Sequence, residues 1–169
     1  MDVIKDLLRI KIFREEKAEL DLLKKKYDLS SKEKQLLKSR SDLEEYKEYF
    51  QKKEIELYED LCSRLVVQKD IDNVSIEIQQ MKNELSKHEE RVESAKEQRN
   101  EAALVVSQAK IVHQEAVRMR EKFMEIRKIQ DSERKIELDR VEDIEMEEVA
   151  EQRFSRKEDQ SEELLENEW

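Results

Sequence analysis

Bulky apolar side chains recur every seventh residue in the first third of the chain. This row consists of Leu22, Leu29, Leu36, Leu43, Phe50 and Leu57. A row of smaller side chains recurs at the same interval further on, comprising Ala95, Ala102, Ala109 and Ala116, with Phe123 after it. Apolar residues seven apart mark the face of an α-helix that packs along a coiled-coil seam. The pattern therefore predicts two long helices, each with one apolar seam.

The two rows fit against each other if the chain folds back and the helices run antiparallel. Facing Leu22 with Phe123 and Leu29 with Ala116 sets a register in which the numbers of facing residues add up to 145 at every layer. At the alanine layers a bulky side chain meets a methyl-sized one, which lets the helix backbones approach closely. This register predicts a turn near Asp72 and Asn73. A shift by one heptad, to a sum of 138 or 152, would place the turn at residue 69 or 76.

The breaks in the pattern agree with two helices and one turn. The sequence contains no glycine and no proline, so the strongest helix breakers are missing. The only mid-chain cluster of Asp, Asn and Ser occupies residues 70–75, and such residues favour turns and helix caps. We therefore predict an all-α fold, a long antiparallel two-helix coiled-coil hairpin, in a single domain covering residues 1–169. Helix one should cover about 3–69, the turn about 70–75 and helix two about 76–160.

Both predicted helices continue their seams beyond the two rows. On helix one the seam is extended by Leu8, Ile12, Leu61 and Leu65. On helix two it comprises Met81, Leu85, His88, Val92, Ala95, Arg99, Ala102, Val106, Ala109, His113, Ala116, Arg120 and Phe123. Polar residues within an apolar seam help to fix the register of a coiled coil. We therefore expect His88 and His113 to act on the register.

The second helix should be the longer one and should extend beyond the first. In the register with a sum of 145, the partner of Met1 is Ile144, so residues 145–169 have no partner within the hairpin. This tail is acidic, because residues 137–169 carry 14 Asp and Glu against 4 Lys and Arg, whereas residues 1–136 carry 30 of each. An isolated helix gains little stability in water. The tail is therefore either frayed or ordered by a partner that contacts Leu164, Leu165 and Trp169.

Composition favours a connective role over a chemical one. Charged residues make up 46% of the chain, which is typical of exposed helices and coiled coils. Disorder is the competing interpretation, but heptads sustained over many turns favour the coiled coil. The net charge of −10 and the carboxylates among the basic residues disfavour nucleic-acid binding.

Sequence motifs for catalysis, metal binding and membrane insertion are missing. No nucleophile has a base and an orienting partner at usable spacing, so we predict no catalytic residue. No Cys or His spacing indicates a metal or another cofactor, and the single cysteine, Cys62, fits a reducing cytoplasm. No stretch approaches the roughly 20 apolar residues that a membrane span requires, and the N-terminus does not resemble a signal peptide.

Two short segments resemble the YscO/FliJ-type stalk proteins of type III secretion. The first, residues 7–19, alternates apolar and basic residues and ends in Lys-Ala-Glu. The second, residues 122–128, has the form Lys-Phe-Met-Glu and precedes a Glu-rich helix through Glu147 and Glu148. The length and the overhanging second helix are similar too. The alanine row and Trp169 depart from the family's pattern.

The resemblance implies a set of partners and a cellular place. It implies a central stalk of a hexameric export ATPase, which also contacts the cytoplasmic domain of the export gate and binds secretion chaperones. Such a protein is not an enzyme, needs no cofactor and does not insert into the membrane. It is a monomeric, cytoplasmic hairpin, peripheral to the secretion apparatus at the inner membrane, in an injectisome or a flagellum. The alternative from a different class is a generic coiled-coil scaffold that forms a homodimer.

Two surfaces of the predicted hairpin suit these partners. The terminal end gathers basic side chains that would suit an acidic ATPase lumen, and the candidates are Arg9, Lys11, Arg14, Lys17, Arg120, Lys122 and Arg127. The turn end gathers apolar side chains, which commonly mark protein contacts when exposed. Its candidates for contact with the export gate or a chaperone are Val66, Val67, Ile71, Val74 and Ile76. An ordinary solvated flank and local packing at the turn are the respective alternatives.

Overall fold

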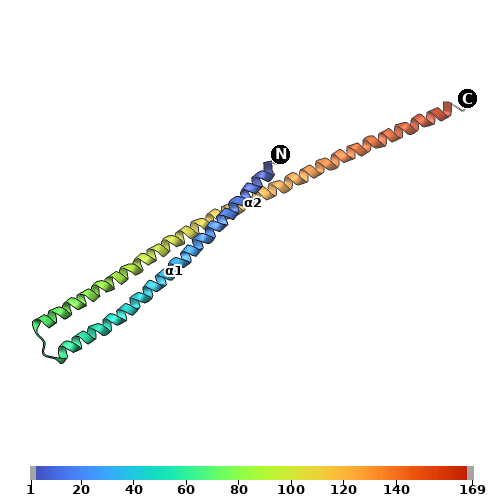
Figure 1. The fold of residues 1–169 in the computed structure, drawn as a ribbon. Helices are drawn as coiled ribbons and strands as arrows, with labels where there is room; N and C mark the ends of the chain where they lie inside the picture. Colours follow the sequence, from blue (N-terminus) through green and yellow to red (C-terminus); the bar gives the residue numbers. More distant parts are fainter. Residues whose placement is uncertain (1–2, 167–169) are drawn as a thin grey trace. The chain divides into compact units, whose positions relative to one another are not determined.

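The computed structural model describes the backbone of residues 3–166 and the side chains of residues 3–154. Within this range the chain forms two α-helices and no strand, with α1 spanning Val3–Ser63 and α2 spanning Gln68–Glu166. Residues 64–67 join the two helices (Figure 1). The predicted all-α hairpin is confirmed. As predicted, α2 is the longer helix, with 99 residues against 61 for α1.

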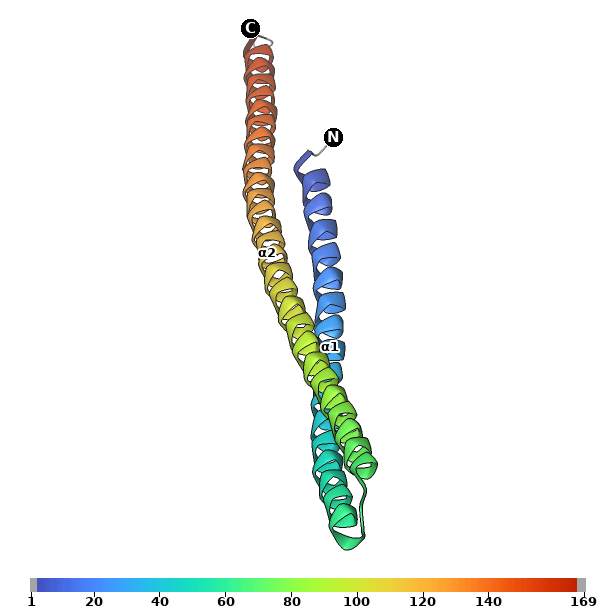
Figure 2. The same cartoon turned by 90° about the vertical axis from the view of Figure 1, so that its left-hand side faces the viewer.

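Contacts group the chain into two units. One is Arg14–Ala116, which contains the turn, and the other combines Met1–Phe13 with Val117–Trp169. Within Arg14–Ala116, the two helices run antiparallel and side by side, as Figures 1 and 2 show from two directions. That the whole chain is a single domain stays a prediction.

An apolar seam holds the Arg14–Ala116 unit together. Its buried side chains are Leu22, Leu36, Leu43, Ile78, Met81, Ala102, Val106 and Ala109. Every seam position predicted for helix two is at least partly buried, so the 4–3 spacing read from the sequence is confirmed there. No described side chain is fully enclosed. The stability of the unit is therefore spread along a thin line of contacts.

The second row of the α1 seam is largely polar, which the sequence prediction missed. Its partly buried positions, three residues after those of the bulky row, are Lys11, Ala18, Lys25, Lys32, Ser39, Tyr46 and Lys53. Ile12 and Leu65 were assigned to the seam, but both are exposed. Ile12 lies one position past Lys11, and Leu65 lies in the turn. Lysine stems can cover apolar surface while their ammonium groups reach water, so lysine is tolerated on this row.

The register of the hairpin differs from the predicted one by two heptads. Leu22 packs with Val106 and Ala109 instead of lying opposite Phe123. The further pairs that join the helices include Lys32–Gln98, Glu33–Arg99 and Tyr46–His88. The residue numbers of these pairs add up to 130, 132 and 134, so the central sum is about 131 and lies outside the considered values of 138, 145 and 152. The prediction failed because both rows repeat every seven residues, and a shift by whole heptads still places leucine opposite alanine.

The turn occupies residues 64–67, and the predicted turn at 70–75 is wrong. The Val67 N–H donates to the Asp70 carboxylate (3.1 Å), and the Asp70 N–H donates to the Val67 carbonyl (2.9 Å). Asp70 therefore caps α2 from within its first turn. Asn73, expected in the turn, is an ordinary helical residue. No described residue has a positive φ, so the chain turns without needing glycine.

The exposed part of α2 begins earlier than predicted. In the unit of Met1–Phe13 and Val117–Trp169, Leu8 is buried and Lys11 Nζ lies 5.2 Å from the centroid of the Phe123 ring. Every side chain from Asp131 to Phe154 is exposed, whereas the prediction placed the start of the unpartnered tail at residue 145. The difference of two heptads equals the error in the register. The predicted docking residues Leu164, Leu165 and Trp169 lie outside the described side chains.

Candidate interaction surfaces

The turn end of the hairpin carries exposed apolar side chains. Leu65 is fully exposed, and Val67 is 65% exposed. Val66, Ile71 and Ile76 are also exposed, whereas Val74 is partly buried on the α2 seam. We call Leu65, Val66, Val67, Ile71 and Ile76 the turn surface. Leu65 was missed as a surface residue because the prediction placed the turn later and assigned Leu65 to the seam.

Local bonds satisfy the polar groups around the turn. Ser63 Oγ donates to the Asp60 carbonyl (2.9 Å), and the Arg64 guanidinium pairs with the Asp60 carboxylate (3.1 Å). The cap between Val67 and Asp70 fixes the start of α2. These local contacts therefore hold the turn in which the apolar side chains of residues 65–67 are exposed. Such a surface can insert into an apolar groove of another protein.

The predicted basic residues are divided between the two units. Arg9, Lys11, Arg120, Lys122 and Arg127 belong to the unit of Met1–Phe13 and Val117–Trp169, whereas Arg14 and Lys17 belong to Arg14–Ala116. Arg9, Arg14, Lys17 and Lys122 are exposed. These four side chains are available to a partner.

Three of the predicted basic residues are partly buried. Lys11 is positioned over the face of Phe123 at 5.2 Å, a cation–π contact. Arg127 Nε lies 3.6 Å from Asp131 Oδ2 on the same helix. Arg120 occupies a seam position. Lys11 and Arg127 therefore make contacts within this chain, in addition to the charge that they would offer to a partner.

A polar cluster joins α1 and α2 within Arg14–Ala116. The Tyr46 hydroxyl donates to the Met81 carbonyl (3.3 Å), and the Tyr46 ring stacks on His88 with centroids 4.8 Å apart. The Tyr49 ring lies 5.7 Å from the Tyr46 ring in a tilted arrangement. His88, which the sequence predicted to help fix the register, thus has a contact partner on α1, Tyr46. Tyr46 was missed because the second row of the α1 seam was not recognised.

The environment of this cluster shifts two pKa values. Burial raises the pKa of the Tyr46 hydroxyl above its ordinary value of 10.0, and the negative charges of Glu84 and ionised Tyr49 act in the same direction. The pKa of Glu84 is lowered, first by the hydrogen bond that its carboxylate accepts from Lys87 (2.6 Å) and then by the charge of Lys87. Tyr46 consequently keeps its proton, and its hydroxyl remains a donor, at neutral pH.

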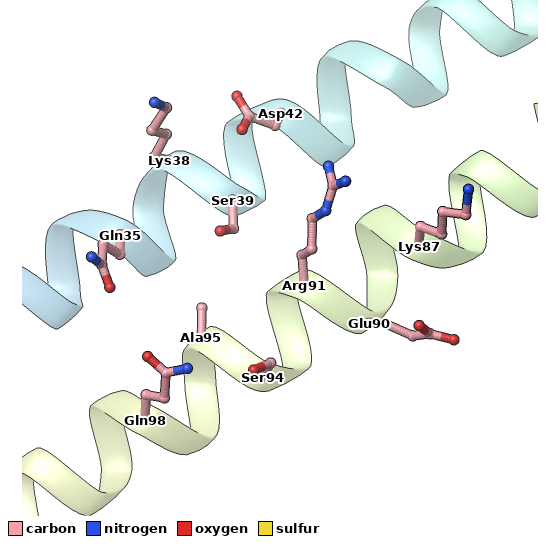
Figure 3. Close-up of a pocket in the computed structure, with 10 residues that line it drawn as sticks. All are labelled: Gln35, Lys38, Ser39, Asp42, Lys87, Glu90, Arg91, Ser94, Ala95 and Gln98. Atoms are coloured by element: carbon pink, nitrogen blue, oxygen red, sulfur yellow. The ribbon is translucent and has the colours of Figure 1, made fainter.

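A shallow groove of about 570 Å³ lies between the helices in the same unit (Figure 3). Small side chains form part of its lining, namely Ser39 from α1 with Ser94 and Ala95 from α2. Charged residues of both signs and two glutamines line the rest, and Arg91 extends from α2 towards α1. The groove is a surface depression above these small side chains, and its lining shows no arrangement typical of a catalytic site.

Outward-facing apolar side chains form a further feature that the sequence reading missed. Leu20 and Tyr27 on α1, and Leu104 and Ile111 on α2, are mostly exposed and lie seven residues apart on their helices. In a two-helix coiled coil these outward positions are normally polar. These residues repeat every seventh position, as the seam residues do, but at other helix positions. That repeat in the sequence could have revealed them.

Two negative findings apply to the part of the chain that the structure describes. No group of three or more His, Cys, Asp or Glu side chains there could hold a metal ion. Neither helix, over its described residues, combines the length and apolar character needed to cross a membrane.

Comparison with known proteins decides the family. The family described as "Type III secretion protein YscO" matches residues 4–152. The chain belongs to this YscO family. A crystal structure of the type III secretion protein YscO from Vibrio parahaemolyticus is similar, with a TM-score of 0.79 and 20% sequence identity, over 86% of this chain and 92% of that chain. At this identity the likeness shows the YscO fold, and the comparison with curated proteins gives no match.

Membership of the YscO family confirms the resemblance seen in residues 7–19 and 122–128. Both segments lie within the matched range. The chain is thus a YscO-type stalk protein of type III secretion, and family membership implies association with the secretion apparatus.

Proposed function

We propose that this YscO-family hairpin links a hexameric export ATPase to the cytoplasmic domain of the export gate and interacts with secretion chaperones. In this role it acts in the cytoplasm, peripheral to the apparatus at the inner membrane, and performs no catalysis. The observation that carries the proposal is the turn surface, because a family hairpin exposes Leu65 and Val67 where the chain reverses. Exposed apolar side chains are unfavourable in water and are commonly covered in a complex.

The turn surface is assigned to the export gate or a chaperone. Replacing Val67 and Ile71 by Asp should weaken binding to the purified cytoplasmic domain of the export gate, or to a purified chaperone, by at least about tenfold, because apolar contacts are lost and two charges are introduced. Isothermal titration calorimetry measures the binding. Circular dichroism should show unchanged helix content, since both side chains are exposed.

A matched control is available on α1. Leu37 is 65% exposed, as Val67 is, but lies far from the turn in sequence. Leu37→Asp should leave binding to both proteins unchanged. If the turn double variant binds the gate and the chaperones as the native protein does, the turn surface has no part in either contact.

We assign the basic residues to the contact with the export ATPase, and the exposure of each side chain decides which residues to substitute. Arg9 and Lys122 are exposed, so Arg9→Glu with Lys122→Glu alters charge without removing the contact between Lys11 and Phe123. The double variant should bind the purified export ATPase more weakly, and the effect should diminish at high salt. Lys34→Glu with Lys110→Glu, two exposed positions in Arg14–Ala116, serves as the control. If the native protein, this double variant and the control variant all bound the ATPase equally, the basic residues would be an ordinary solvated flank with no part in that contact.

The monomeric hairpin is favoured over the homodimeric scaffold by the packing of the seam. Leu22 packs with Ala109 of its own chain, so the bulky row is already covered and is not free to pair across a two-fold axis. Light scattering of the purified protein should give the mass of a monomer. A dimer mass at micromolar concentration would favour the scaffold.

A further inference from the structure

The seam of Arg14–Ala116 is compatible with more than one register. In the observed register Leu22, Leu29 and Leu36 lie level with Ala109, Ala102 and Ala95, and Leu43 lies level with His88, because the sum is about 131. A shift by one heptad, to a sum of 138, places these four leucines level with Ala116, Ala109, Ala102 and Ala95. The shifted register therefore has one more leucine–alanine layer than the observed one.

Few contacts distinguish the two registers. The ion pair between Glu33 and Arg99 (3.4 Å) and the hydrogen bond from Lys32 to Gln98 (3.2 Å) are exposed, and exposed pairs of this kind contribute little. The main contact specific to the observed register is the ring stack of Tyr46 on His88, because the main-chain carbonyl that the Tyr46 hydroxyl bonds at Met81 has an equivalent at residue 88 after the shift. In the shifted register His88 lies level with Phe50, another aromatic ring that can cover it.

The chain also contains a second set of turn residues at the required place. A sum of 138 moves the centre of the hairpin from about residue 65 to residue 69. Asp72 and Asn73, which are helical in the observed register, are residue types that cap helix N-termini well. No glycine or proline opposes extension of α1 through residues 64–67.

From these observations we propose that the Arg14–Ala116 hairpin is a two-register device whose helices slide past each other by one heptad. The slide moves one helix by about 10 Å relative to the other, from seven residues at about 1.5 Å each. Tyr46, through its ring contact with His88, retains the observed register. The slide changes which residues form the turn, so it would alter the turn surface from within the hairpin. This inference does not depend on the partners proposed above.

Disulfide trapping tests the slide directly. Three double variants, each with Cys62→Ser, share Leu22→Cys and combine it with Ala109→Cys, Ala116→Cys or Val112→Cys. The first pair lies level in the observed register, the second lies level in the shifted one, and Val112 is an exposed control at an intermediate height. A disulfide requires Cα atoms about 4.4–6.8 Å apart. Mild oxidation of dilute protein, followed by mass spectrometry, measures the rate of each disulfide within one molecule.

The proposal predicts a clear order of rates. The 22–109 disulfide should form fastest, the 22–116 disulfide should form more slowly but reach completion, and the 22–112 pair should stay reduced. Adding Tyr46→Ala should accelerate the 22–116 disulfide about fivefold, since it removes the ring contact with His88 that the observed register provides, and an aromatic pair is worth about that factor. A second set, Leu36→Cys with Ala95→Cys or with Ala102→Cys, should show the same order and guards against a variant that disturbs one layer.

Three results would overturn the proposal. One is the absence of both shifted disulfides, 22–116 and 36–102, after the observed-register disulfides are complete. Another is a 22–112 rate equal to the 22–116 rate, because local opening would then explain both. The third is a 22–116 disulfide found only between two molecules.

Discussion

At the scale of single residues, Tyr46 makes a contact that distinguishes the observed register from those that differ by whole heptads. Its hydroxyl bonds across to the Met81 carbonyl, and its ring stacks on His88. The leucine rows provide apolar burial, but they provide it equally in registers that differ by whole heptads. The ring contact with His88 has no such periodic equivalent, because a shift by one heptad puts Ala95 in the place of His88. Tyr46 therefore selects a register that burial alone leaves open.

Removing only the Tyr46 hydroxyl should measure how much its hydrogen bond contributes to the stability of the folded hairpin. Tyr46→Phe retains the ring over His88 and loses the hydrogen bond to Met81, so we expect a loss of about 1 kcal/mol in the free energy of unfolding. Urea denaturation followed by circular dichroism gives the value. Tyr27→Phe is the control, because Tyr27 is largely exposed and its change should stay within about 0.5 kcal/mol. Equal effects of the two substitutions would contradict the assignment.

The raised pKa of Tyr46 predicts a pH dependence with a defined sign. The folded protein holds the phenol proton more tightly than the unfolded chain, whose Tyr46 titrates near 10.0. The stabilisation is therefore complete below that pH and is lost as pH rises through the higher folded-state value. Urea denaturation at about pH 8 and about pH 11 should show the advantage of the native protein over Tyr46→Phe shrinking at the higher pH. A constant advantage would show that the Tyr46 environment does not change on unfolding.

At the scale of elements, one carboxylate sets the start of α2. Asp70 accepts a hydrogen bond from the Val67 N–H and donates its own N–H to the Val67 carbonyl. A helix begins where its unpaired N–H groups find an acceptor. Several acidic and amide side chains between residues 70 and 75 could do this, and only the conformation of residues 64–67 selects Asp70.

Substitutions at Asp70 and Asn73 should separate the observed turn from the one predicted from sequence. Asp70→Ala removes the carboxylate that accepts from the Val67 N–H and should lower the free energy of unfolding by about 0.5–1.5 kcal/mol, the net worth of one hydrogen bond. Asn73→Ala replaces a residue inside α2 with a better helix former and should leave stability unchanged or slightly raised. Thermal and urea unfolding of both variants provide the comparison. A larger loss for Asn73→Ala would favour the later turn.

At the scale of the whole molecule, the part of α2 from Asp131 onwards lengthens the helix but has no buried side chain among its described residues. All side chains from Asp131 to Phe154 are exposed. A helix without a packed face gains little stability of its own. The stability of Arg14–Ala116 should therefore be independent of this segment.

Deleting residues 131–169 tests this independence. The midpoint of urea unfolding should stay nearly constant, with a change in the free energy of unfolding within about 0.5 kcal/mol. The helical signal in circular dichroism should fall only by the contribution of the residues removed. A loss of more than about 2 kcal/mol would reveal packing between the deleted segment and the remaining chain.

The sequence by itself determined the helical class, the hairpin and the seam positions of α2. These follow from the seven-residue spacing and from the lack of glycine and proline, which act through the fixed geometry of the α-helix. The apolar turn residues Val66, Val67, Ile71 and Ile76 were also identified, although the turn was placed too late. The basic residues were identified by charge, but Lys11 and Arg127 proved to have intramolecular partners.

Only the tertiary structure decided the register, the position of the turn and the start of the exposed part of α2. The physical reason is the periodicity of the pattern. Burial of Leu22 against an alanine has nearly the same free energy at Ala109 and at Ala116, so apolar spacing alone cannot separate these registers. The choice depends on contacts between particular side chains distant in sequence, such as Tyr46 with His88, and on the cap at Asp70.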